Sequence, residues 1–282
     1  MPLRYVEPSS VLETCALLRS NRDARLIAGG TAVVLMLRQR LIDPSLLIGL
    51  RRVPGLDSIT AASQWLSIGA AVTLQQVADS DRVRALAPSL AAACQEVGNV
   101  RVRNRATLGG NLAEADYASD PPAVLASLGA VVCTAAPEGG GRRIPVSDLI
   151  TDYYTTQLTS DEVVLRVEVP LIDGRRSAYV KYRSRSSEDR PCVGVAASLV
   201  PDPQGWVASL EVVVGAVTST PQRMTTATEG VVGARLDEAR AGAVAAAVAA
   251  AIHPIADGRG SAWYRTQVIE VMVRRALAMV VA

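Results

Sequence analysis

Short blocks of apolar and polar residues alternate along the first fifty residues and predict helices and strands in turn. Ser10 stands three residues before Glu13, the spacing of a capping box, so we expect a helix to begin there. The apolar residues 25–28 predict a strand that runs into Gly29-Gly30, and a second helix is expected over 32–40. A strand, a glycine pair and a helix in this order place backbone N–H groups where they can bind an anion.

A second lobe with a similar pattern is predicted over residues 56–112. Strands are expected near 56–59 and 65–68, and Thr73 is expected to open a helix. The lobe ends in a second glycine pair, within residues 107–111 (Thr-Leu-Gly-Gly-Asn), where we expect no regular element to continue.

Two further signals complete the predicted N-terminal domain. Asp120 is the predicted N-cap of a helix that begins at Pro121. Alternation of apolar and polar positions over 163–170 predicts a half-buried strand. We place a boundary after residue 173, which gives a first domain of residues 1–173 with lobes of about 1–55 and 56–173.

The remaining residues, 174–282, predict a smaller α+β domain. Two long strands are expected over 192–200 and 208–217, followed by helices over 237–252 and from 261 to the end. This order predicts a sheet with helices on one side. The fold class expected for the whole chain is therefore α+β.

The charge balance excludes several classes of partner. The 282 residues carry 29 basic and 27 acidic side chains, a net charge of +2, which offers no footprint for a phosphate backbone. The most apolar stretch, 243–252, is about half of the ~20 residues that a membrane span requires. The first residues lack the basic and apolar regions of an export signal. We expect a cytoplasmic protein without a membrane span or a nucleic-acid partner.

The chain offers few residues for metal binding or nucleophilic catalysis. Its only histidine, His253, follows an alanine-rich run and lies far in sequence from both glycine pairs, so we interpret it as a helix-end residue. We expect no metal site, no iron–sulfur cluster and no catalytic residue on this chain, because the four cysteines are widely spaced and form no C-x-x-C pair. They are Cys15, Cys94, Cys133 and Cys192.

The glycine pairs fit neither the dinucleotide pattern G-x-G-x-x-G nor the Walker pattern G-x-x-x-x-G-K-[ST]. Two such segments on one α+β unit can instead hold a diphosphate between them through backbone donors. Ordinary tight turns are the other interpretation, and spacing alone favours neither. Lys181 is the only lysine among the 29 basic residues, which indicates either a need for a compact ammonium or chance.

Three segments resemble the FAD-binding medium subunit of the molybdenum hydroxylases, the family of the carbon monoxide dehydrogenase and xanthine dehydrogenase flavoproteins. They are 27–31 (Ile-Ala-Gly-Gly-Thr), 103–113 (Arg-Asn-Arg-Ala-Thr-Leu-Gly-Gly-Asn-Leu-Ala) and 116–122 (Asp-Tyr-Ala-Ser-Asp-Pro-Pro). The likeness continues through 179–183, 193–196, 263–265 and 273–277, so it covers nearly the whole chain in order. The run from Asn104 to Pro122 is its most specific part.

The resemblance implies a two-lobed FAD-binding domain of the vanillyl-alcohol-oxidase type, followed by a small α+β domain. It implies that Asp120 and the backbone of Val164 contact FAD, the latter in the adenine region. It also implies that Lys181 approaches the isoalloxazine, where its cation would stabilise the negative charge of reduced flavin. The two glycine segments that would hold the diphosphate contribute Ile27, Ala28, Gly29, Gly30, Thr31 and Ala32, and Thr107, Gly109, Gly110 and Asn111.

Two positions depart from the family pattern. Thr31 stands where carbon monoxide dehydrogenases commonly have His-Ser, which argues against assignment to a true carbon monoxide dehydrogenase. Val97 stands where xanthine dehydrogenases place an aromatic residue over the flavin, which argues against a xanthine-type flavin face and NAD⁺ reduction.

The function favoured by the resemblance is electron transfer within a larger complex. The family implies a large partner with a molybdenum cofactor, a small partner with [2Fe-2S] clusters, and assembly as a dimer of heterotrimers in which FAD on this chain passes electrons to an external acceptor. Two alternatives stay open: a self-contained FAD oxidase, disfavoured by the absence of a candidate base, and an assembly subunit without flavin, disfavoured by the intact glycine pairs. The substrate and the acceptor stay open as well.

Overall fold

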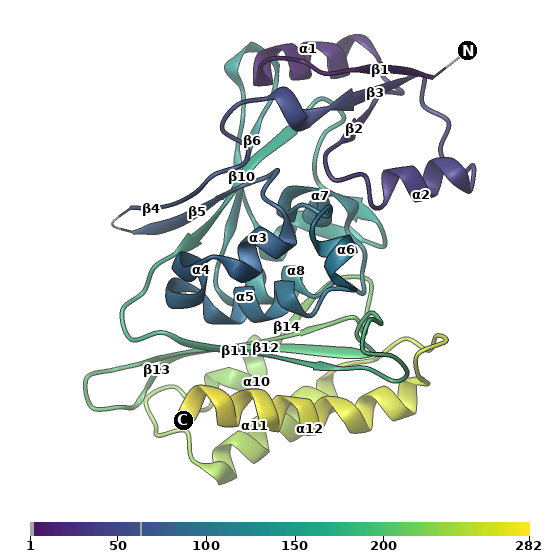
Figure 1. Cartoon of the computed structure of the whole chain (residues 1–282). Coiled ribbons are helices and arrows are strands. Elements are labelled where there is room, and N and C mark those ends of the chain that lie inside the picture. Colours follow the sequence, from purple (N-terminus) through teal and green to yellow (C-terminus); the bar gives the residue numbers. More distant parts are fainter. Residues whose placement is uncertain (1–2, 63) are drawn as a thin grey trace.

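The computed structural model describes residues 3–62 and 64–282, and its first layer is a three-stranded parallel sheet in the order β1-β3-β2 (Figure 1). Ser10 accepts a hydrogen bond from the Glu13 N–H and caps α1, as predicted, but the Glu13 carboxylate binds the Ser9 N–H and leaves the capping box incomplete. Cys15 of α1 packs in the core beneath the sheet. The elements are β1 (Arg4–Val6), α1 (Val11–Ser20), β2 (Arg25–Ile27), α2 (Val33–Arg38), β3 (Leu46–Gly49) and the 3₁₀ turn η1 (Leu50–Arg52).

The second layer is a five-stranded antiparallel sheet in the order β4-β5-β10-β6-β7, with several short helices packed against it. Its strands are β4 (Ile59–Ala62), β5 (Trp65–Gly69), β6 (Val131–Ala135), β7 (Arg143–Pro145) and β10 (Val163–Pro170). The helices are α3 (Leu74–Asp79), α4 (Asp81–Leu86), α5 (Pro88–Gln95), α6 (Val100–Arg103), α7 (Leu108–Glu114), α8 (Pro121–Ser127) and α9 (Val146–Leu149). The turn η2 (Pro137–Gly139) joins β6 to β7, and β8 (Ile150–Asp152) pairs with β9 (Thr155–Thr156).

The third layer is a four-stranded antiparallel sheet in the order β11-β12-β13-β14, followed by three helices. The strands are β11 (Arg176–Tyr182), β12 (Val193–Pro201), β13 (Val207–Gly215) and β14 (Gln222–Arg223), and the helices are α10 (Thr225–Glu229), α11 (Glu238–Ala251) and α12 (Ala262–Val281). No helix among the described residues is both long and apolar enough to cross a membrane. The predicted boundary after residue 173 falls in the connection between β10 and β11.

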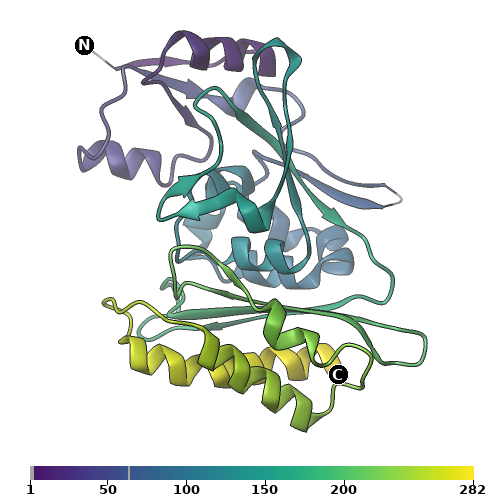
Figure 2. The ribbon, with the colours of Figure 1, turned by 180° about the vertical axis from the view of Figure 1, so that it is seen from behind.

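The C-terminal sheet is buried on both faces (Figures 1 and 2). Alternate residues of its strands, such as Val195 and Val212, pack in one core with α11 and α12. The residues that point the other way, Tyr179, Ala196 and Val213, belong to the core of the second layer and pack toward α5 and α8. The expected sheet with helices on one side is therefore correct for the domain itself, and the N-terminal domain covers the other side.

Two local predictions are wrong, and one strand was not predicted. The strand expected near 56–59 begins only at Ile59, because Leu56 turns into the core of the first layer. The strand without a predicted counterpart is β11, the edge strand that carries Lys181. The second glycine pair lies in the first turns of α7, and it does not interrupt regular structure, because the Thr107 side chain caps that helix through the Gly110 N–H.

Candidate cofactor-binding site

The two glycine segments, separated by eighty residues, lie directly against each other. A Cβ atom built on Gly29 would lie 1.7 Å from the carbonyl oxygen of Arg105, so only glycine allows this contact between the two backbones. Gly30 has φ +77°, in the left-handed region that favours glycine, and it turns the chain from β2 toward α2. The structure thus brings together the two segments that the sequence pointed to.

The first segment keeps its backbone donors available. In the part of the chain that the structure describes, the N–H groups of Thr31, Ala32 and Val33 have no protein acceptor, and no side chain caps α2. Thr31 is exposed, and Ile27, Ala28, Gly29, Gly30 and Ala32 are partly buried. Such donors at the start of a helix suit an anion such as a phosphate.

The second segment has already used its backbone donors. The N–H groups of Leu108 and Gly109 donate to the carbonyls of Val72 and Ala70, each at 2.9 Å. Those of Gly110 and Asn111 donate to the Thr107 hydroxyl at 3.2 Å and the Thr107 carbonyl at 2.8 Å. The prediction that both segments offer backbone amides to an anion therefore fits the first segment and does not fit the second.

In the second segment, the lack of side chains at its two glycines allows other groups to come close to the backbone. A Cβ on Gly109 would lie 2.5 Å from the Ala70 Cβ, so this glycine lets α7 pack on the segment after β5. A Cβ on Gly110 would meet only the Thr107 Oγ1, at 2.7 Å, and Gly110 is exposed. Asn111 exchanges hydrogen bonds with Ser119 at 2.8 and 3.0 Å. Gly110 therefore leaves an exposed surface without a side chain, which would admit a bulky group.

Asp120 stands at the predicted N-cap position of α8 and its backbone is helical, but its side chain does not cap the helix. Instead its carboxylate accepts a hydrogen bond from the Tyr179 hydroxyl at 2.6 Å and forms an ion pair with the Lys181 Nζ at 2.9 Å. The Lys181 ammonium also donates to the Glu96 carbonyl oxygen at 2.7 Å, and the side chains of the pair are only 2% and 3% exposed.

Burial raises the pKa of the Asp120 carboxyl to about 6, and the opposing effects of Lys181 and Tyr179 offset this only in part. Burial also raises the pKa of the Tyr179 hydroxyl, which therefore stays a proton donor. Gly194 makes room for this tyrosine, since a Cβ there would lie 2.5 Å from its hydroxyl oxygen. The structure thus places Asp120 and Lys181 together, in one buried polar cluster between the two domains.

Val164 lies on β10 beside a bulge. The pairing of β10 with β6 shifts register between Val164 and Arg166, and the intervening Leu165 accepts a hydrogen bond from the Ala70 N–H at 2.9 Å. Because the Ala70 carbonyl in turn accepts from Gly109, the bulge connects β10 to the start of α7. Leu165, the residue after Val164, is therefore connected to the second glycine pair through two hydrogen bonds.

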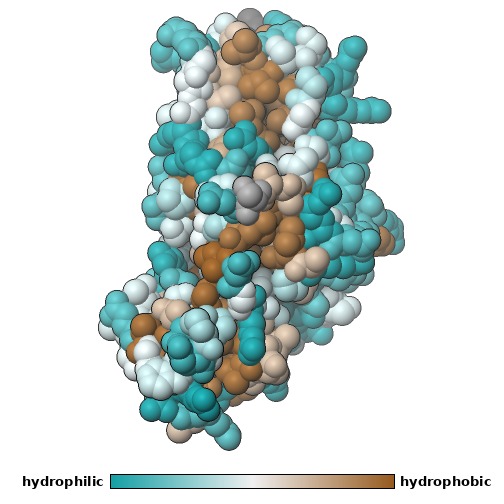
Figure 3. Space-filling model, turned by 90° about the vertical axis from the view of Figure 1, so that its left-hand side faces the viewer, coloured by the Kyte–Doolittle hydropathy of each residue, from teal (hydrophilic) through white to brown (hydrophobic). Residues whose placement is uncertain are grey.

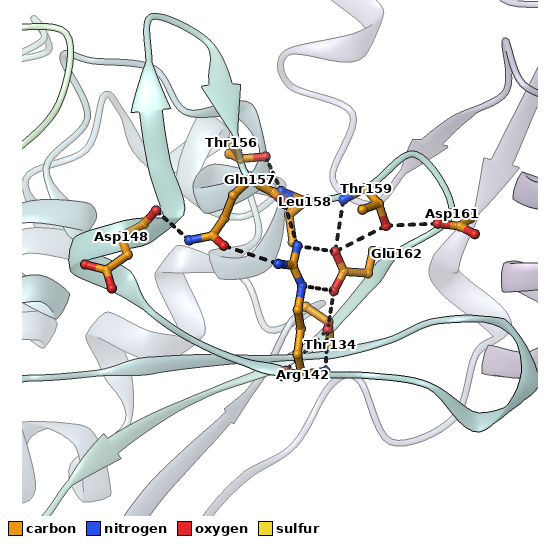
Figure 4. A network of polar contacts seen from close by, with 9 residues as sticks. All are labelled: Thr134, Arg142, Asp148, Thr156, Gln157, Leu158, Thr159, Asp161 and Glu162. Carbon is orange, nitrogen blue, oxygen red and sulfur yellow. Dashed lines mark hydrogen bonds and ion pairs between the residues drawn. The ribbon is translucent and has the colours of Figure 1, made fainter.

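A polar network fixes the chain just before Val164 (Figure 4). The Arg142 guanidinium donates to both carboxylate oxygens of Glu162 at 2.8 Å, and the Thr134 hydroxyl and Thr159 N–H also donate to that carboxylate. Burial raises the pKa of Glu162, but these hydrogen bonds outweigh burial and lower it to about 2. Because Gln157 accepts from Arg142 and donates to the Asp148 carbonyl, the network connects β6, the residue before β7, α9 and the segment 157–162.

The remaining candidates form none of the hydrogen bonds described above. His253 is exposed just after α11, and Val97 is partly buried against the core of the second layer. All four cysteines are buried, and burial raises the pKa of each thiol. In the described residues no group of three or more His, Cys, Asp and Glu side chains is arranged to hold a metal ion.

Sequence reasoning missed Ala70, Arg105 and Tyr179. The first two contribute backbone atoms, so their side chains carry no signal. Tyr179 could have been found, because it lies two residues before Lys181 and therefore on the same face of a strand.

Comparisons with known proteins match both halves of the chain. Residues 1–172 match the family described as the FAD binding domain in molybdopterin dehydrogenase, and residues 178–280 match the CO dehydrogenase flavoprotein C-terminal domain. The chain is 34% identical to the 6-hydroxypseudooxynicotine dehydrogenase complex subunit alpha of Paenarthrobacter nicotinovorans, over 97% of this chain and 93% of that protein. It is 31% identical to the carbon monoxide dehydrogenase medium chain of Hydrogenophaga pseudoflava, over 97% and 95%. The solved structure of quinoline 2-oxidoreductase from Pseudomonas putida 86 superposes with a TM-score of 0.93 at 31% identity, over 100% of this chain and 97% of that one.

The fold is that of a two-domain flavoprotein, with an FAD-binding domain and a C-terminal α+β domain. The chain belongs to the family of FAD-binding medium subunits of the molybdenum hydroxylases.

Proposed function

We propose that this chain binds FAD between its two glycine segments and acts as the electron-transfer subunit of a molybdenum-containing hydroxylase or dehydrogenase. The observation that carries the proposal is the available N–H groups of Thr31, Ala32 and Val33 beside the Gly29–Arg105 contact, in a chain that has the FAD-binding domain. When bound, FAD would accept electrons from a partner subunit and deliver them to an external acceptor.

In this proposal the two segments contribute differently to the diphosphate site. The N–H groups of Thr31 and Ala32 and the Thr31 hydroxyl donate hydrogen bonds to the diphosphate, and Gly29 and Gly30 shape the turn that presents them, with Ile27 and Ala28 leading into it. From the other side, Gly110 admits the cofactor to close contact. The Thr107 hydroxyl and the Asn111 side chain supply polar atoms there, with Gly109 keeping α7 in place.

The residues beyond the two segments complete the proposed site. The backbone of Val164 contacts the adenine region from β10, where the Arg142–Glu162 network holds the preceding segment. Asp120 and Lys181 form the polar support for the flavin end. Because the Lys181 ammonium already has Asp120 as its counter-ion, its effect on the reduction potential of the flavin depends on the protonation of that carboxyl.

Oxidation of the substrate is proposed to take place on other chains. This family consists of medium subunits, and relatives are named as chains of nicotine hydroxylase, caffeine dehydrogenase and carbon monoxide dehydrogenase. We therefore propose a large partner with the molybdenum cofactor and a small partner with [2Fe-2S] clusters, assembled as a dimer of heterotrimers. Large apolar side chains exposed on the surface support such assembly, among them Leu35 and Trp263, and one face of the molecule carries a band of apolar residues (Figure 3).

The experiment that tests the proposal is affinity purification of the tagged full chain from its native host under mild conditions. The visible spectrum, the flavin released by acid and the masses of the co-purifying chains are recorded. We expect about one FAD per chain, together with one large chain and one small cysteine-rich chain. Flavin without partners would favour a self-contained oxidase, and partners without flavin would favour an assembly subunit; either result would overturn the proposal.

A further inference from the structure

The loop 115–120 connects two residues of the proposed FAD site, because it leads from α7, which carries Asn111, to Asp120. Ala115 has φ +51°, a left-handed conformation that is uncommon for a residue with a side chain. Ser119 is bound by Asn111, and Asp116 forms an ion pair with Arg190 of the β11–β12 connection at 2.8 Å. Within the loop, Asp116 accepts hydrogen bonds from the Ala118 N–H at 3.1 Å and the Ser119 N–H at 2.9 Å. Contacts inside the loop and contacts outside it therefore both hold its shape.

Tyr117 at the centre of this loop makes its strongest contacts with the C-terminal domain. Its hydroxyl donates to the Asp257 Oδ2 at 3.0 Å and accepts from the Arg259 guanidinium, whose central carbon lies 5.1 Å from the centre of the tyrosine ring. On the other side, the rings of Tyr153 and Tyr154 pack edge-on against Tyr117, with centroids 5.1 and 6.3 Å away. Tyr117 is thus partly buried between two other parts of the chain, residues 153–154 and residues 257–259.

The acceptor of this contact is itself rigidly fixed. Asp257 forms ion pairs with Arg259 at 2.6 Å and with Arg265 at 2.5 Å, and the Arg265 side chain is fully buried. Arg265 also donates to the Ala216 carbonyl at the end of β13. A buried guanidinium needs its carboxylate partner, so Asp257 is held in one position by the C-terminal core. Asp257 and Arg259 therefore form a preordered contact site for Tyr117 of the FAD domain, which we call the clamp.

We propose that Asp257 and Arg259 are positioning residues for the cofactor site, which hold Tyr117 and thereby keep the loop 115–120 in the shape that places Asn111 and Asp120. This inference rests on the proposed FAD function and extends it, because it makes the affinity for FAD depend on a contact from the C-terminal domain. Both hydrogen bonds of the Tyr117 hydroxyl and the cation–π contact with Arg259 contribute to the clamp.

The test compares Arg259→Ala with Arg175→Ala in the full-length chain. Arg175 is a matched control, because it also joins the two domains, donating to the Leu128 and Pro170 carbonyls at 2.9 and 3.0 Å, but does not contact the loop. The dissociation constant of FAD is measured by quenching of flavin fluorescence, and the thermal midpoint is measured without FAD. We expect Arg259→Ala to weaken FAD binding at least tenfold, Arg175→Ala to leave it within twofold, and both to lower the midpoint similarly.

A second variant keeps the test decisive if Arg259→Ala fails to fold. Tyr117→Phe retains the ring and its packing and removes both hydrogen bonds, so we expect a several-fold weaker FAD affinity and faster amide hydrogen exchange confined to residues 115–120. Unchanged affinity and unchanged exchange in Tyr117→Phe, or equal losses of affinity in Arg259→Ala and Arg175→Ala, would overturn the clamp. A wild-type chain that binds no FAD would overturn the proposed function instead, so the two failures are distinguishable.

Discussion

The two glycine segments look alike in sequence and differ in what they offer a ligand. At Gly29-Gly30 the chain turns with a left-handed residue, and the following N–H groups of Thr31 to Val33 stay available. At Gly109-Gly110 the first four N–H groups of α7 are all bound within the chain. A glycine pair can thus leave backbone N–H donors free for a ligand, as the first segment does. It can also leave room for a ligand by lacking side chains, as the second segment does.

The largest effect is expected from removing the contact between the segments. Gly29→Ala would place a Cβ 1.7 Å from the Arg105 carbonyl oxygen, so the two backbones must separate. We expect a loss of roughly 3 kcal/mol in the free energy of unfolding and no FAD in the purified chain. Urea unfolding and the flavin content measure this. Gly230→Ala serves as a control, since Gly230 has helical φ and a Cβ there meets nothing within 4 Å. Normal FAD content in Gly29→Ala would disprove the need for the contact.

The next largest effect is expected from filling the space at Gly110 in the second segment while leaving the N–H donors of the first segment unchanged. Gly110→Val places a Cβ 2.7 Å from the Thr107 Oγ1, so this hydroxyl must shift. Because Gly110 is exposed, we expect the chain still to fold and its FAD binding to be abolished. Circular dichroism verifies the fold, and equilibrium dialysis with FAD measures binding. Full flavin occupancy would show that the second segment does not border the cofactor.

A smaller effect concerns Asp120, which follows the second segment. Its pKa is about 6 in the folded chain and 3.8 is the ordinary value, so the folded state holds this proton more tightly than the unfolded state does. The contribution of Asp120 to stability is therefore greatest below about pH 4 and falls as the pH rises through about 6. Comparing urea unfolding of the wild type and Asp120→Asn at pH 4 and pH 7 tests this. The stability advantage of the wild type should shrink as pH rises, and a growing advantage would contradict the assignment.

The smallest effect tests the Thr107 cap. Thr107→Ala and Thr73→Ala each remove the side chain that caps a helix, so each should lose about 1 kcal/mol of stability. Only Thr107 belongs to the second segment, so only its variant should weaken FAD binding, by a few fold. Parallel titrations with FAD measure the difference, and equal affinities would restrict Thr107 to a structural role.

The sequence predicted those features that depend on neighbours along the chain. The caps at Ser10 and Thr73, the strand over 163–170 and the two glycine segments all follow from local patterns. The sequence did not predict features that depend on residues far away along the chain. Asp120 has the sequence position of an N-cap, yet its carboxylate turns to Lys181, because a buried ammonium 61 residues away needs a counter-ion.

The same limit applies to the site. Its key contact is between Gly29 and a backbone carbonyl of Arg105, and no side-chain pattern records which carbonyl a glycine will meet. The clamp on Tyr117 joins residues that are 140 positions apart, and its members have no motif of their own. The resemblance to a family supplied the cofactor, and the division of work between the two segments became visible only from the hydrogen bonds.

The C-terminal sheet, with a core on each face, also determines how the protein can be divided. If residues 174–282 were removed, the apolar surface of α5 and α8 that packs on Tyr179, Ala196 and Val213 would be exposed to water. If residues 1–173 were removed, the face of the C-terminal sheet that packs on α5 and α8 would be exposed to water. We therefore expect neither domain to fold stably on its own. The intact chain should unfold in a single cooperative transition in calorimetry. A fusion or truncation that respects the domain boundary in the sequence would still cut through a shared core.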